Sequence, residues 1–130
     1  MTSEINVNQD IVLLPSTTRS GGGTVNSADQ DNPYWIGCVL YLNITQSSGT
    51  GGLKLLLEYK DPASGNYVPI WSSLVYTATG PYALIVHPNG NLDHGSGEST
   101  PAALPRTWRI QISPQDASAY TYSVGCSLLK

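Results

Sequence analysis

The sequence predicts an all-β fold, namely a single antiparallel β-sandwich or jelly-roll-like domain of about seven or eight strands with an extended N-terminal arm. Three observations support this prediction. Apolar residues recur at every second position in several short segments, which is the period of a half-buried strand. Turn-forming residues separate these segments at a spacing of roughly ten residues. No segment shows the 3.6-residue period of an amphipathic helix.

The first 34 residues differ in character from the rest. They are polar and are interrupted by Pro15, a glycine run at 21–23 and Pro33. Their one apolar run reads as a short strand and comprises Ile11, Val12, Leu13 and Leu14. We therefore expect an extended arm over residues 1–34, with the glycine run as a hinge, and a β-sandwich domain over residues 35–130.

Alternation assigns the faces of the strands in the sandwich. In segment 35–44, one set of side chains is expected to point to the core: Ile36, Cys38, Leu40, Leu42 and Ile44. The other set is expected on a surface: Trp35, Val39, Tyr41 and Asn43. Further strands are predicted at 53–59, 67–74, 81–87, 107–112 and 120–128, with an edge or a bulge at Pro69. Segment 88–105 shows no period and is predicted to be a long loop.

Charge and hydropathy exclude some classes of partner. Charged residues make up 12% of the chain and the net charge is −3. The six Lys and Arg residues are scattered, whereas a nucleic-acid binder needs clustered cations, so we expect no nucleic-acid partner. No apolar run approaches the about 18 residues of a membrane span, and the N-terminus does not resemble a secretion signal. We therefore expect that the protein has no membrane partner. We also expect that it is synthesised in a cytosol.

No pattern of residues predicts catalysis, a metal site or a cofactor. His87, Asp93 and His94 match no metal-ligand spacing, and their loop is rich in glycine. Glu58 is expected to be an exposed strand residue and Asp61 to cap a turn before proline, so a glycosidase pair is disfavoured. Neither Cys38 nor Cys126 has a neighbouring histidine, and both fall on core faces. Two buried thiols are expected, and a disulfide between them remains an alternative if their strands are neighbours.

The aromatic residues are the better candidates for function. The chain has eight Tyr, three Trp and no Phe, and Tyr and Trp are favoured at half-hydrated interfaces. Trp35 and Tyr41 share the outward face of one predicted strand. They are candidates for a sugar-stacking platform, for a protein interface, or for packing under loops, and the residues alone leave these three interpretations open.

Three segments carry a resemblance to a known family: Lys60–Tyr67 (K-D-P-A-S-G-N-Y), Leu104–Ile110 (L-P-R-T-W-R-I) and Tyr120–Leu129 (T-Y-S-V-G within it). In this order they resemble a family of small structural proteins of tailed bacteriophages, over most of the chain from about residue 35 onward. The resemblance implies a virion component made in the cytoplasm of a bacterial host. The chain departs from the family in its glycine-rich arm and in Cys126, where a small residue is usual.

Together these observations predict a non-enzymatic capsid decoration (cement) protein on the virion surface. Its expected partner is the major capsid protein, and a homo-oligomer such as a trimer is expected from capsid geometry. The strand Ile11–Leu14 would add to a capsid edge or a sister subunit, and Arg109 would face a carboxylate on a neighbouring subunit. Two alternatives remain: a carbohydrate-binding adhesion module on the virion that uses Trp35 and Tyr41, and a low-copy tail or head–tail joining component.

Overall fold

The fold is a two-layer β-sandwich without helices in the described part of the chain. A computed structural model describes residues 9–32, 34–89 and 97–130. Its strands are β1 (Gln9–Arg19), β2 (Val25–Asn26), β3 (Gln30–Asp31), β4 (Gly37–Ser47), β5 (Leu53–Lys60), β6 (Tyr67–Ser72), β7 (Gly80–Val86), β8 (Gly97–Thr100), β9 (Thr107–Pro114) and β10 (Tyr120–Leu129). None of these residues forms a helix with the length and apolar character needed to cross a membrane.

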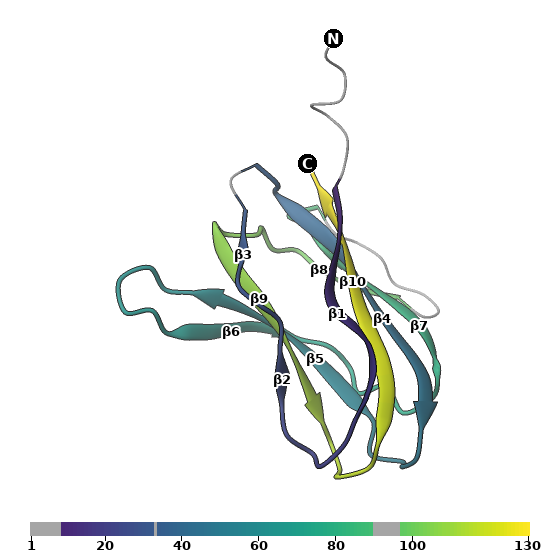
Figure 1. Ribbon diagram of the computed structural model, residues 1–130. Helices are drawn as coiled ribbons and strands as arrows, with labels where there is room; N and C mark the ends of the chain where they lie inside the picture. The colour runs from purple at the N-terminus through teal and green to yellow at the C-terminus, as the bar shows by residue number, and fades with distance from the viewer. Residues whose placement is uncertain (1–8, 33, 90–96) are drawn as a thin grey trace.

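The strands form two sheets of five. Sheet A has the order β1-β10-β4-β7-β8, and sheet B has the order β2-β9-β5-β6, with β3 also paired to β9. Figure 1 shows β1, β10, β4 and β7 side by side in one layer. In the other layer, the turn end of the β5–β6 hairpin projects past the neighbouring strands. All pairs are antiparallel except β7–β8, which is parallel. The all-β sandwich prediction is confirmed, and the additional strands are the short β2, β3 and β8.

The core lies between the sheets and follows the predicted alternation. In β10, for example, Tyr122, Val124 and Cys126 are buried and alternate with partly exposed Ser123 and Gly125. The buried apolar set of sheet B is Leu53, Leu55, Leu57, Trp108, Ile110 and Ile112. These residues meet the inward residues of β4 and β7 from sheet A, which closes one core.

The start of β4 corrects one predicted face. Ile36 was expected in the core, but it is 42% exposed and precedes the strand, which begins at Gly37. A Cβ at Gly37 would lie 2.3 Å from the carbonyl oxygen of Val86, so only glycine allows β4 to approach β7 here. The strand starts at Gly37, two residues after the start of the predicted segment, so Ile36 lies outside the alternation. Its N–H donates to the Leu129 carbonyl, and its own carbonyl accepts from the Leu104 N–H.

The N-terminal segment is not a separate arm. Residues 9–19 form an 11-residue strand paired with β10, and β2 and β3 pair with β9 in the other sheet. From residue 9 onward, the predicted arm therefore contributes to both layers of the sandwich. The glycine run carries the chain from sheet A to sheet B, with φ of +95° at Gly21 and +77° at Gly22.

Segment 88–105, predicted to be a loop, contains β8, which pairs with β7 through four residues. Residues 90–96 lie outside the described residues. Pro69 was predicted to mark an edge or a bulge, and this prediction is confirmed. It lies on β6, the edge strand of sheet B, next to a register shift in the β5–β6 pairing.

The two cysteines are diagonal neighbours on adjacent strands. Leu128 pairs with Cys38 and Leu40 with Cys126, and both cysteines are buried. Diagonal Cα atoms are about 7–8 Å apart, beyond the about 4.4–6.8 Å usual for disulfides. A hydrogen bond with Cys126 and burial raise the pKa of the Cys38 thiol, which keeps it protonated and unreactive.

We therefore expect both thiols to remain free after exposure to air. Titration with a thiol reagent in denaturant should count two thiols per chain, and the folded protein should react far more slowly because both sulfur atoms are buried. A fraction of molecules lighter by two hydrogens under non-reducing conditions would contradict this prediction.

Candidate functional site

The two sheets differ sharply in charge. In the four strands β1, β10, β4 and β7 of sheet A, only Asp10 and Arg19 are charged. The three ion pairs of the described residues all involve sheet B: Lys60–Asp29 at 3.0 Å, Arg106–Asp31 at 2.6 Å and Arg109–Glu58 at 2.8 Å. These four strands of sheet A therefore present a broad outer face with almost no charge, and the fifth strand, β8, carries Glu98 at the edge of the sheet.

The centre of this face is formed by four residues in register, which we call the central patch: Val12, Gly125, Tyr41 and Ala83. Val12 is 73% exposed and Tyr41 is 45% exposed. Gly125 lies between them, and a Cβ there would meet only the carbonyl oxygen of Ile11 and the Tyr41 ring, both at 4.0 Å. The patch thus has two raised apolar side chains on either side of an open position. Tyr41 faces outward, as the alternation predicted.

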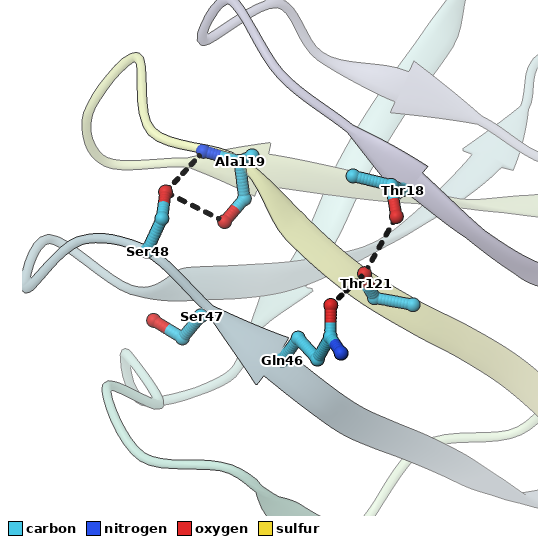
Figure 2. Close-up of a pocket in the computed structure, with 6 residues that line it drawn as sticks. All are labelled: Thr18, Gln46, Ser47, Ser48, Ala119 and Thr121. Atoms are coloured by element: carbon cyan, nitrogen blue, oxygen red, sulfur yellow. Dashed lines mark hydrogen bonds between the residues drawn. The ribbon is translucent and has the colours of Figure 1, made fainter.

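A hollow of about 410 Å³ lies at one end of the same sheet. Its lining residues come from β1, β4, β10, the turn after β4 and the turn before β10: Thr18, Gln46, Ser47, Ser48, Ala119 and Thr121. Figure 2 shows that Thr121 lies between Thr18 and Gln46, with its hydroxyl hydrogen-bonded to both. The hydroxyl–hydroxyl distance to Thr18 is 2.7 Å, and the distance to Gln46 Oε1 is 3.4 Å. No charged side chain is among the lining residues.

The predicted partner strand Ile11–Leu14 is already used within the chain. Its residues pair with Val124–Cys126 of β10, so the segment is a strand of the sandwich and not a free arm. Because β1 is the edge strand of sheet A, a partner strand would have to add to its outer edge. A register shift between Val12 and Leu14 turns two consecutive leucines inward, and Leu13 and Leu14 are 8% and 7% exposed. Ile11 packs partly against the core and Val12 faces solvent. This corrects the expectation that the segment is a free arm.

Arg109 is also used within the chain. Its Nε donates to Glu58 Oε1 at 2.8 Å, and its guanidinium lies 3.4 Å from the centroid of the Tyr67 ring. Only 18% of its side chain and 9% of the Glu58 side chain are exposed. Arg109 does point away from the core, but its carboxylate partner lies on β5 and not on a neighbouring subunit. Glu58, expected to be exposed, is covered by this arrangement.

Trp35 does not share a face with Tyr41. It lies before β4, packs partly against the core, and has the Lys130 ammonium 5.5 Å from its ring centroid. Its backbone N–H donates to Asn32 Oδ1, and Asn32 Nδ2 donates to its carbonyl. Tyr41 lies four residues into the strand, about 14 Å from the first residue of β4 at the usual rise. The two rings therefore do not form one stacking platform.

The remaining candidates for chemistry have structural roles. Asp61 accepts hydrogen bonds from the Ser64 hydroxyl at 2.7 Å and the Ala63 N–H at 3.0 Å, and these bonds lower the pKa of its carboxyl. It caps the β5–β6 turn, as predicted. His87 Nδ1 accepts from the Asn89 N–H, whereas Asp93 and His94 lie outside the described residues. In the part of the chain described, no group of three or more His, Cys, Asp or Glu is placed to hold a metal ion.

Sequence patterns did not indicate the hollow. Its residues are separated by up to 103 positions and are ordinary strand-end and turn residues. The small outward residues of β10, such as Thr121, follow from period-2 alternation. Which residues of β1 and β4 stand beside them depends on the register of the three strands. The one signal available in the sequence was the small number of charged residues. The structure shows that β1, β4, β7 and β10 of sheet A are especially poor in them.

Comparison with known proteins adds evidence on the fold alone. No protein-family model matches the chain, and no curated protein matches its sequence. Among solved structures, the chain is similar to a mitogen derived from Yersinia pseudotuberculosis (YPM). The TM-score is 0.50 at 14% sequence identity, and the alignment covers 95% of this chain and 88% of that one. This likeness supports the all-β sandwich.

Proposed function

We propose that this chain is a capsid decoration protein of a tailed bacteriophage, which docks through the outer face of sheet A onto the major capsid protein of an assembled head. The observation that carries the proposal is the nearly uncharged outer face with the central patch at its middle. The resemblance of three segments to small phage structural proteins supplies the class of partner.

The chemistry of the face suits a protein interface. Burying a charged side chain without a partner is costly, so interface cores are depleted in charge and enriched in tyrosine. Tyr41 and Val12 would enter the partner surface, while the open position over Gly125 would receive a partner side chain or backbone. Sheet B suits this role less well, because its strands and the residues beside them carry the three ion pairs, and covering charged side chains costs hydration.

The proposed mechanism is stabilisation by mass action. A module that binds the assembled shell but not its separated subunits shifts the equilibrium toward the shell. Neighbouring copies would surround the symmetry axes of the head, so the proposal includes a homo-oligomer such as a trimer. The site of action would be the outer surface of the virion, after synthesis in the host cytoplasm.

The first test is quantitative peptide mass spectrometry of virions whose genome encodes the chain, with the major capsid protein as internal standard. Decoration predicts one copy per capsid subunit or one per three. Tens of copies or fewer per particle would indicate a tail or head–tail joining component, and absence from the virion would overturn the proposal.

A second measurement locates the docking surface. Heads lacking the chain should rebind the purified wild-type protein, while Tyr41→Ser and Gly125→Val should rebind at least tenfold more weakly. Val68→Ser is the matched control, because Val68 is also 45% exposed but lies on β6 of sheet B. Equal binding by all four proteins, or a loss with Val68→Ser alone, would exclude the outer face of sheet A.

A further inference from the structure

We infer that the hollow at the end of sheet A binds a neutral polyhydroxylated ligand, namely a sugar residue of an uncharged glycan. This inference goes beyond the proposed docking of the central patch. Its volume of about 410 Å³ falls within the range of about 300–1,000 Å³ usual for small-molecule sites.

The first argument is the hydrogen-bonding capacity of the lining. A hydroxyl has one donor hydrogen and two acceptor lone pairs, and the Gln46 amide has donors and an acceptor. If Thr121 donates to Gln46 Oε1, Thr18 must donate to Thr121, because each hydroxyl has a single hydrogen. The lone pairs of Thr18 and the Gln46 amide hydrogens then remain for a ligand. The hollow thus combines donors and acceptors, as the adjacent hydroxyls of a sugar do.

The second argument is charge. The nearest cation along the chain is Arg19, next to Thr18. Its guanidinium donates hydrogen bonds to the carbonyl oxygens of Tyr122 at 2.9 Å and Pro15 at 2.8 Å, and it lies over the Tyr122 ring. The carbonyl oxygens do not neutralise its charge, but Arg19 is not among the lining residues, and none of these carries a charge to pair with an anionic ligand. A neutral ligand loses less hydration on entry, and uncharged partners satisfy it.

The third argument is that the walls are held in place. Ser48 Oγ accepts from the Ala119 N–H at 2.8 Å and donates to the Ala119 carbonyl at 3.1 Å. Below them, Asp116 accepts from the Tyr120 hydroxyl at 2.7 Å and the Gly51 N–H at 2.8 Å. These hydrogen bonds lower the pKa of the Asp116 carboxyl, and the bond from Tyr120 has the largest effect. They also hold together the turn after β4 and the turn before β10, which contain Ser48 and Ala119. A site fixed in advance loses little entropy on binding.

Another hollow among the described residues does not compete as a site for neutral sugars. It has a volume of about 360 Å³ and is lined in part by Lys60, Asp61 and Arg106. Its cations are already paired with Asp29 and Asp31, and the Asp61 carboxylate caps a turn. The hydroxyl-lined hollow is therefore the better candidate for an uncharged ligand.

The test uses the full chain on an array of immobilised neutral and sialylated oligosaccharides, where dense display amplifies weak binding. We expect binding to neutral glycans, with no gain from sialylation. The best neutral oligosaccharide is then titrated into labelled protein and followed by amide chemical shifts. The largest shifts should fall on residues 46–48 and 119–121.

Thr121→Val keeps the β-branched shape and removes only the hydroxyl, so it should stay folded and lose at least tenfold in affinity. Gln46→Leu should have a similar effect, while Ser123→Ala, two residues along on the same face of β10, should bind like wild type. No binding to any neutral glycan, binding that depends on sialylation, or full binding by Thr121→Val would overturn the inference. Tyr41 is five residues from Gln46 along β4, so the central patch and the hollow are separated by roughly 17 Å. Tyr41→Ser therefore tests head docking, while Thr121→Val tests glycan binding, and either proposal can fail without the other.

Discussion

Replacement of Leu14 with alanine is expected to lower the free energy of unfolding by about 2–5 kcal/mol, the usual cost of truncating a buried leucine. Replacement of Val12 with alanine, two residues earlier, should change it by less than about 0.5 kcal/mol. Leu14 is 7% exposed and packs in the core, whereas Val12 is 73% exposed on the same strand. The pair of variants thus compares a buried and an exposed position in β1.

The measurement is denaturant unfolding followed by tryptophan fluorescence, with the slope checked for two-state behaviour. Three tryptophans report on the transition, and Trp108 is fully buried. Equal and small effects of the two substitutions would contradict the pairing of β1 with β10 and would restore the free arm expected from sequence. A large effect at Val12 alone would place the register of β1 one residue away from that described here.

Replacement of either Glu58 or Arg109 with leucine is expected to destabilise the fold by about 2–3 kcal/mol, whereas the double replacement should cost less than either single one. A fully buried ion pair that loses one partner costs about 3–5 kcal/mol, because the other charge stays buried and unpaired. We expect less here, since 18% of the Arg109 side chain is exposed and its guanidinium stacks on Tyr67. In the double variant no charge is left unpaired.

The check is a double-mutant cycle on the same unfolding assay, with Arg106→Leu as the control. Arg106 and Asp31 also form an ion pair, but their side chains are 71% and 68% exposed, so no measurable change is expected. Additive effects of the Glu58 and Arg109 replacements would show that the two side chains do not interact. That result would return Arg109 to the role expected from sequence, a contact with a neighbouring subunit.

The alternation of β4 and β10 was predictable from sequence because it depends on chain geometry alone. Successive side chains of a strand point to opposite faces, so Leu40 and Val124 had to be inward and Tyr41 and Gly125 outward. The Asp61 turn was predictable for a similar reason, since an Asp before proline with glycine later favours a hairpin turn.

The N-terminal segment was not predictable in the same way. Its strands β2 and β3 have two residues each and join the sheet through backbone hydrogen bonds, which leave no pattern of side chains. In β1, the register shift turns Leu13 and Leu14 to the same side, which breaks the alternation. A polar segment with one apolar run therefore resembled an arm, although it forms an edge strand.

By itself, the sequence determined the all-β class, the core faces of β4, β5, β7, β9 and β10 and the outward position of Tyr41, because these follow from local period and turn chemistry. Only the tertiary structure decided that Glu58 stands opposite Arg109, that Val12 and Tyr41 flank Gly125, and that Thr18, Gln46 and Thr121 line one hollow. These contacts depend on which strands are neighbours and in what register. The hydrophobic pattern of a strand fixes which of its faces is buried, but which strands become neighbours is decided by the packing of the whole sandwich.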